Sequence, residues 1–74
     1  MLKLSLEAIE IIDSIDRGGS FAAAAEALHK VPSTISYTVG KLEDQLGFQL
    51  FARHGPRVSL TAAGRELLSE GRWL

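Results

Sequence analysis

The chain has no cysteine, which excludes disulfide bridges and thiolate metal sites. Its two histidines, His29 and His54, are far apart in the sequence and have no cysteine beside them, so we expect no metal site and no cofactor. No apolar run approaches the length of a signal peptide or a membrane span. We therefore expect a soluble, cytoplasmic protein without a membrane partner.

Catalytic motifs are also missing. No serine, histidine and acidic residue follow a hydrolase motif, and 74 residues leave little room for a substrate cleft. A chain of this length forms one small domain with a thin core. We therefore expect that the chain is not an enzyme.

Neither sign of charge predominates in the whole chain, but the charges are unevenly distributed along it. The net charge is −1, whereas residues 1–27 have a balance of −3, residues 28–57 a balance of +2, and residues 58–74 are neutral. The positive middle segment is consistent with a nucleic-acid-binding surface or with an ordinary solvated surface of mixed charge. Its cationic residues are Lys30, Lys41, Arg53 and Arg57.

The first half of the chain predicts two helices. Ser5 is a good N-cap for a helix over residues 5–17, and Leu4 and Ile9 have the spacing of a hydrophobic staple. Gly18-Gly19 ends this helix. Ser20 caps a short second helix over residues 21–28, and residues 29–31 form a turn. The apolar face of the first helix consists of Leu6, Ala8, Ile9, Ile12 and Ile15.

A third helix follows, over residues 31–46. Pro32 suits its first position, and Gly47 ends it as a C′ glycine. Gly40 is unfavourable in mid-helix by about 1 kcal/mol relative to alanine, and close approach of another group is the only reason that the sequence offers for it. One buried stripe is expected from Ile35, Val39, Leu42 and Leu46, which leaves Ser33, Ser36, Tyr37, Gly40 and Lys41 facing outward.

The pattern then changes to β-type. Residues 48–51 and 58–60 predict two strands, and residues 52–57 predict the turn of a β-hairpin. Thr61 caps a fourth helix from about Ala62 onward.

This order of elements predicts a mainly α fold of the winged helix-turn-helix type: a three-helix core, a two-stranded β-hairpin wing and a C-terminal helix. The major groove of DNA is about 12 Å wide and admits one helix. The third helix has the required division, with an apolar stripe on one side and short polar residues on the other. Residues 31–42 are therefore expected to enter the groove, with residues 32–37 at its reading end and Arg53 and Arg57 on the wing.

The chain resembles the N-terminal domain of LysR-type transcriptional regulators over roughly residues 5–70. The matching residues are Gly19-Ser20-Phe21, Ala24-Ala25-Glu26, Leu28, Ser36, Val39, Lys41-Leu42-Glu43, Leu46-Gly47, Leu50-Phe51, Arg53 and Leu60-Thr61-Ala62-Ala63-Gly64. Many members have Gln in place of Pro32 and Arg in place of Tyr37. The Tyr37 hydroxyl and ring are left to contact a phosphate, a base edge or a thymine methyl group.

The resemblance implies a bacterial transcription factor that binds a dyad-symmetric operator as a homodimer or tetramer. It also implies an effector-binding domain beyond a long linker helix, which is absent here, so the chain looks like an excised DNA-binding fragment. Residues 1–60 would be the DNA-binding domain and residues 61–74 the start of the linker and dimerisation helix, with Leu67, Leu68, Trp73 and Leu74 on it.

Ten residues are expected to contact DNA, although each also has a purely structural interpretation. Tyr37 would otherwise pack on the domain surface, Arg53 would form a salt bridge, and Ser20 would act only as a cap. The alternative function is a helical protein-interaction module without DNA binding, which would expose an apolar patch. The expected DNA contacts are Ser20, Lys30, Pro32, Ser33, Thr34, Ser36, Tyr37, Lys41, Arg53 and Arg57.

Overall fold

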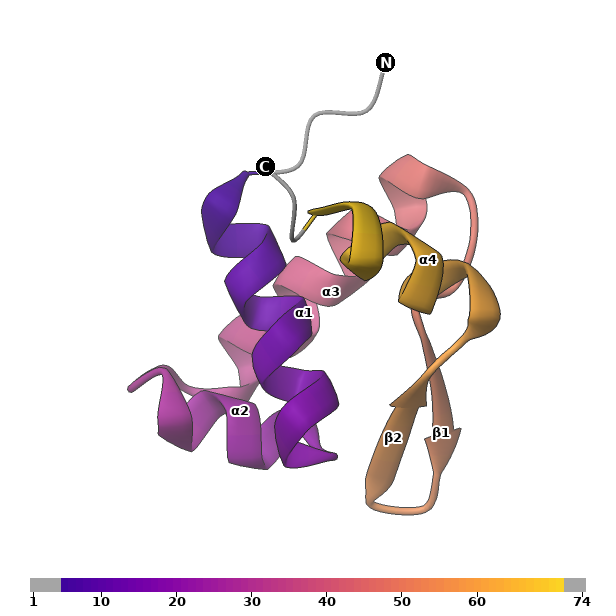
Figure 1. Cartoon of the computed structure of the whole chain (residues 1–74). Coiled ribbons are helices and arrows are strands. Elements are labelled where there is room, and N and C mark those ends of the chain that lie inside the picture. The colour runs from indigo at the N-terminus through magenta and orange to yellow at the C-terminus, as the bar shows by residue number, and fades with distance from the viewer. Residues whose placement is uncertain (1–4, 72–74) are drawn as a thin grey trace.

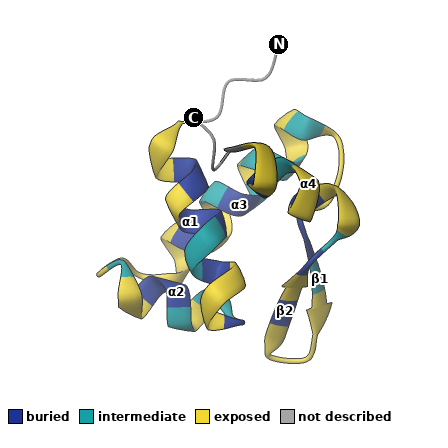
Figure 2. Ribbon diagram, viewed as in Figure 1, coloured by how far each residue is buried: buried dark blue, intermediate teal, exposed yellow. Residues whose placement is uncertain are grey.

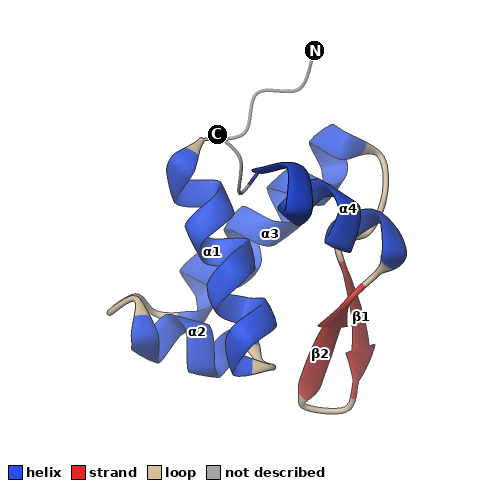
Figure 3. Ribbon diagram, viewed as in Figure 1, coloured by secondary structure: helices blue, strands red, loops and turns tan. Residues whose placement is uncertain are grey.

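A computed structural model describes residues 5–71 of the chain. Within these residues the elements follow the order α1 (Leu6–Gly18), α2 (Phe21–Ala27), α3 (Pro32–Leu46), β1 (Phe51–His54), β2 (Arg57–Leu60) and α4 (Ala62–Gly71). The first three helices pack together, and the hairpin extends to one side of them below α4 (Figures 1 and 3). The mainly α fold with a two-stranded antiparallel wing is confirmed.

Polar side chains start three of the helices, as the sequence predicts. Each hydroxyl oxygen accepts a hydrogen bond from the backbone N–H three residues later, which satisfies a donor that the helix itself leaves unpaired. The pairs are Ser5 with Ala8 at 3.1 Å, Ser20 with Ala23 at 3.0 Å, and Thr61 with Gly64 at 3.0 Å. Helix α3 differs, because its N-cap residue is Val31 and no side chain caps it.

Two helix ends depend on glycine. Gly19 has φ +76°, and its N–H donates to the carbonyl oxygen of Ile15 at 2.8 Å, which closes α1. Gly18, predicted to lie beyond the helix, is instead its last residue. Gly47 has φ +80° and closes α3 in the same way, with its N–H on the carbonyl oxygen of Glu43. Both glycine stops were visible in the sequence.

The core lies between α1, α3 and the base of the hairpin. Its largest fully buried side chains come from these three regions. Buried segments, dark blue in Figure 2, also occur on α2. The predicted face of α1 needs one correction: Leu6 is 71% exposed, whereas Ile11 is 1% exposed. Helices α2 and α3, β2 and α4 all contact α1, so its buried face is wider than one stripe. The most buried large residues are Ile11, Ile12, Ile15, Ile35 and Leu50.

The predicted first strand is wrong in position. It was expected over residues 48–51, but β1 begins at Phe51 and runs to His54. In the antiparallel register Phe51 pairs with Leu60, and His54 pairs with Arg57. The second strand is close to its predicted position and begins one residue earlier, at Arg57.

Helix α4 packs back onto the domain. Leu68 is 2% exposed and belongs to the core, so it is not available to a partner, and Leu67 packs against the core from its edge. Leu4 of the predicted staple, and Trp73 and Leu74 of the predicted linker helix, lie outside the described residues.

Candidate nucleic-acid interface

Helix α3 presents two different faces. Ile35 and Val39 are buried at 0% and 2% exposure, and Leu42 and Leu46 pack against the core from its edge. The opposite face of the helix is exposed, and Tyr37 is 70% exposed. The structure therefore places six of the predicted contact residues at the surface of this one helix: Pro32, Ser33, Thr34, Ser36, Tyr37 and Lys41.

Helix α2 packs against both α1 and α3. Its residues Ala24 and Ala25 are buried, and its Ala23 methyl group lies so close to Gly18 of α1 that a Cβ there would approach it to 2.9 Å. The turn between α2 and α3 passes through His29, which has φ +56°. The next residue, Lys30, is exposed, and its backbone N–H donates to the carbonyl oxygen of Ala25 at 2.9 Å.

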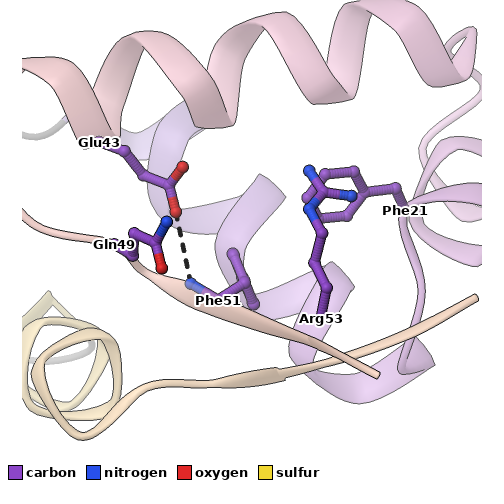
Figure 4. Close-up of a pocket in the computed structure, with 5 residues that line it drawn as sticks. All are labelled: Phe21, Glu43, Gln49, Phe51 and Arg53. Carbon is purple, nitrogen blue, oxygen red and sulfur yellow. Dashed lines mark hydrogen bonds between the residues drawn. The ribbon is translucent and has the colours of Figure 1, made fainter. Parts of the chain in front are cut away.

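The wing is attached to α3 by Glu43. Its carboxylate oxygen Oε2 accepts a hydrogen bond from the backbone N–H of Leu50 at 2.8 Å. It also accepts one from the backbone N–H of Phe51 at 3.4 Å, which Figure 4 shows as a dashed line. The last turn of α3 therefore fixes the first residue of β1, which explains why the strand begins later than predicted. Glu43 is one of the residues that match the family pattern, but no role was predicted for it.

Arg53 is held above an aromatic ring. Its guanidinium carbon lies 4.8 Å from the centroid of the Phe21 ring, within the range of a cation–π interaction. The Phe21 ring in turn meets the Phe51 ring edge to face, with centroids 5.9 Å apart. Figure 4 shows these groups around a hollow between α3 and β1. Residues of α2, α3 and the wing line it: Phe21, Glu43, Gln49, Phe51 and Arg53.

Arg57 lies at the other edge of the wing, beside the junction of α1 and α2. The N–H of Val58 donates to the carbonyl oxygen of Gly19 at 2.9 Å, and the Arg57 guanidinium packs over Gly19, where a Cβ would collide with it. Glycine at position 19 therefore permits both the left-handed backbone conformation and the close packing of the Arg57 guanidinium. Ser20 follows directly, is half-buried, and uses its hydroxyl oxygen to cap α2.

The predicted cations remain available for an external anion. Among residues 5–71, none of Lys30, Lys41, Arg53 and Arg57 forms an ion pair with a carboxylate. The salt bridge considered for Arg53 is thus not formed with any described residue, and the Phe21 ring takes its place. The support that Phe21 gives to Arg53 was not predicted, because the two residues are far apart in the sequence and meet only in the folded chain.

Among residues 5–71, no group of three or more metal-ligating side chains comes together. None of the helices described is long and apolar enough to cross a membrane.

The sequence matches one family model, described as "Bacterial regulatory helix-turn-helix protein, lysR family", over residues 6–65. Among curated relatives, the probable HTH-type transcriptional regulator YhaJ of Escherichia coli K12 is 55% identical over 71 residues, or 96% of this chain. The HTH-type transcriptional regulator PunR of the same strain is 53% identical over 64 residues, or 86% of this chain. The chain spans only 24% of YhaJ and 21% of PunR.

Solved structures show the same architecture. The crystal structure of the CbnR_DBD–DNA complex superposes with a TM-score of 0.87 at 30% identity, covering 95% of this chain and 80% of that one. ArgP from Mycobacterium tuberculosis superposes with a TM-score of 0.84 at 35% identity, covering 96% of this chain and 27% of that one. With the family match covering most of its length, the chain belongs to the lysR family of bacterial regulatory helix-turn-helix proteins.

Proposed function

We propose that the chain is the sequence-specific DNA-binding domain of a bacterial transcription regulator, with a binding role and no catalytic one. The observation that carries the proposal is the two-sided α3: its apolar stripe is buried, and its face of small polar residues is exposed. A helix of this kind fits the major groove. The DNA complex of CbnR_DBD, a structural relative, supports the same role.

We propose roles for the ten predicted contact residues by their positions. The reading end of α3 supplies Pro32, Ser33, Thr34, Ser36 and Tyr37 for base edges or nearby phosphates. The remaining residues face the backbone or the minor groove. Lys41 lies further along α3, Lys30 lies in the turn, Ser20 begins α2, and Arg53 and Arg57 lie on the wing.

We propose the domain boundaries on the same basis. Residues 1–60 form the DNA-binding domain, and residues 61–74 begin the linker helix that joins two copies in a homodimer or tetramer on a dyad-symmetric operator. A shallow groove along α4, lined by Phe48, Ala63 and Leu67 with Glu66 and Glu70, supports a partner contact here. A small-molecule effector would act on a further domain, and a cytoplasmic location follows from the DNA target.

The proposal is tested by fluorescence anisotropy with a labelled random-sequence duplex and a labelled dyad-symmetric promoter fragment over a series of salt concentrations. We expect binding that weakens steeply with salt, because lysine and arginine side chains displace cations condensed on the phosphates. Binding to the promoter fragment should be tighter than binding to the random duplex. Absence of binding to either duplex at low salt would overturn the proposal and favour a protein-interaction module.

A further inference from the structure

Helix α3 begins in a way that its own stability does not explain. The other helices with a described start are capped by Ser5, Ser20 and Thr61, whereas α3 has Val31 at its N-cap and no side-chain hydrogen bond there. A serine, threonine, asparagine or aspartate at this position stabilises a helix relative to an aliphatic residue. Val31 is also 60% exposed, so its side chain does not contribute much to the core.

Tyr37, further along α3, is a second large side chain that is exposed to solvent. Its side chain is 70% exposed, and none of the hydrogen bonds among the described residues involves its hydroxyl. Among residues 5–71, few large hydrophobic residues are exposed: Leu6 begins α1, Phe48 lies in the loop after α3, and Val31 and Tyr37 both belong to the start of α3. The reading end of the helix therefore exposes apolar surface without an internal reason.

The chemistry of this segment restricts which base it can recognise. A guanine is read best by an arginine or lysine, an adenine by an asparagine or glutamine amide, and a cytosine by a carboxylate. Residues 31–38 contain none of these side chains. Their polar groups are short hydroxyls, and that of Thr38 is occupied by the carbonyl oxygen of Thr34 at 2.9 Å. The base feature that apolar side chains recognise in the major groove is the 5-methyl group of thymine.

We propose that Val31 and Tyr37 read thymine methyl groups, so that the domain selects its sequence largely by apolar contact. This inference rests on the proposed function, because it requires α3 to lie in the major groove. It adds Val31, which was not among the expected contact residues, and it assigns the Tyr37 ring rather than its hydroxyl to base recognition. Serine would be the better N-cap at position 31. A contact between the valine methyl groups and an external partner accounts for the presence of valine there.

Deoxyuridine provides the direct test, because it pairs as thymidine does and lacks only the 5-methyl group. A preferred duplex is selected from a random pool with the 74-residue chain, and each thymidine is then replaced singly by deoxyuridine. At one or two positions in each half-site we expect the affinity to fall about threefold to fivefold, the value of one buried methyl group. Anisotropy at one fixed salt concentration measures each affinity.

Variants assign the methyl contact to its residues. Val31→Ser and Tyr37→Ser should each bind thymidine and deoxyuridine duplexes equally at one of these positions, whereas Val31→Ile and Tyr37→Phe should keep the difference. Leu6→Ala is the matched control, because it removes an equally exposed apolar side chain from α1. Val31→Ser should also raise the Tm by about 4–8 °C through a new cap. If Val31→Ser no longer distinguishes thymidine from deoxyuridine, this loss therefore cannot be attributed to unfolding.

The possible failures are distinguishable. If no duplex is enriched or bound, both the proposed function and this inference are overturned. If the domain binds DNA but no deoxyuridine replacement lowers its affinity, only the inference is overturned. It is overturned as well if both serine variants keep the full difference between thymidine and deoxyuridine.

Discussion

Gly40 is the residue whose presence the domain itself explains least. It lies in the middle of α3, and a Cβ at this position would meet nothing within 4 Å. Glycine is less favourable than alanine in a helix interior by about 0.8–1.0 kcal/mol. Helical spacing places Gly40 one turn after Ser36 and Tyr37, where it is half-buried in the isolated domain. Residues that lower local stability without an internal benefit are expected at functional surfaces.

Gly40→Ala should therefore change stability and DNA binding in opposite directions. We expect the free energy of unfolding to rise by about 1 kcal/mol, because the new methyl group has room and alanine favours the helix. DNA affinity should fall, because the methyl group holds the duplex away from α3. Thermal unfolding and anisotropy measure the two effects. Ser69→Ala on α4 is the control, with a small gain in stability and unchanged affinity; unchanged affinity of Gly40→Ala would remove Gly40 from the interface.

Single residues also mark the limit of prediction from the sequence. The caps Ser5, Ser20 and Thr61 were predictable, because a cap depends on residues only three positions away. The support of Arg53 was not, because Phe21 lies on another element and reaches the arginine only in the folded chain. The exposure of Leu6 was missed because helical spacing alone does not say how many neighbours cover a helix.

Among the elements, the wing depends on one side chain of α3. Its hairpin has only four residues in each strand, and such a hairpin is marginal without further support. Glu43 supplies support by accepting the N–H groups of Leu50 and Phe51. A local pattern of apolar residues could not reveal this contact across seven residues, which is why the start of β1 was predicted three residues too early. The helices, with local periodicity and caps, were predicted to within about one residue.

Glu43→Ala should loosen the wing without unfolding the helices. We expect a loss of about 1–3 kcal/mol in the free energy of unfolding, because two part-buried N–H groups lose their acceptor. Amide hydrogen exchange at Leu50 and Phe51 should become faster, while exchange in α1 changes less. Asp44→Ala removes the same charge from the neighbouring exposed position and is the control. Equal effects of the two variants on exchange would show that Glu43 does not hold the wing.

At the scale of the whole molecule, the net charge of −1 gives a misleading impression of the surface. The acidic residues are concentrated in the first part of the chain, and the unpaired cations of the middle segment lie on α3, the preceding turn and the wing. The asymmetry is visible in the sequence, but the absence of ion pairs at these four cations among the described residues is not, because the fold decides which charges meet. The position of the cations, rather than their sum, should determine how the domain responds to salt.

Removal of one interface cation should therefore reduce the salt dependence of DNA binding by a definite amount. Each phosphate contact contributes about 0.9 to the slope of log K against log salt concentration, so Lys41→Gln should reduce the slope by about one. Arg65→Gln on α4 changes the net charge of the molecule equally but lies outside α3 and the wing, and it should leave the slope unchanged. The same slope change in both variants would mean that overall charge governs binding, and would contradict the interface proposed on α3.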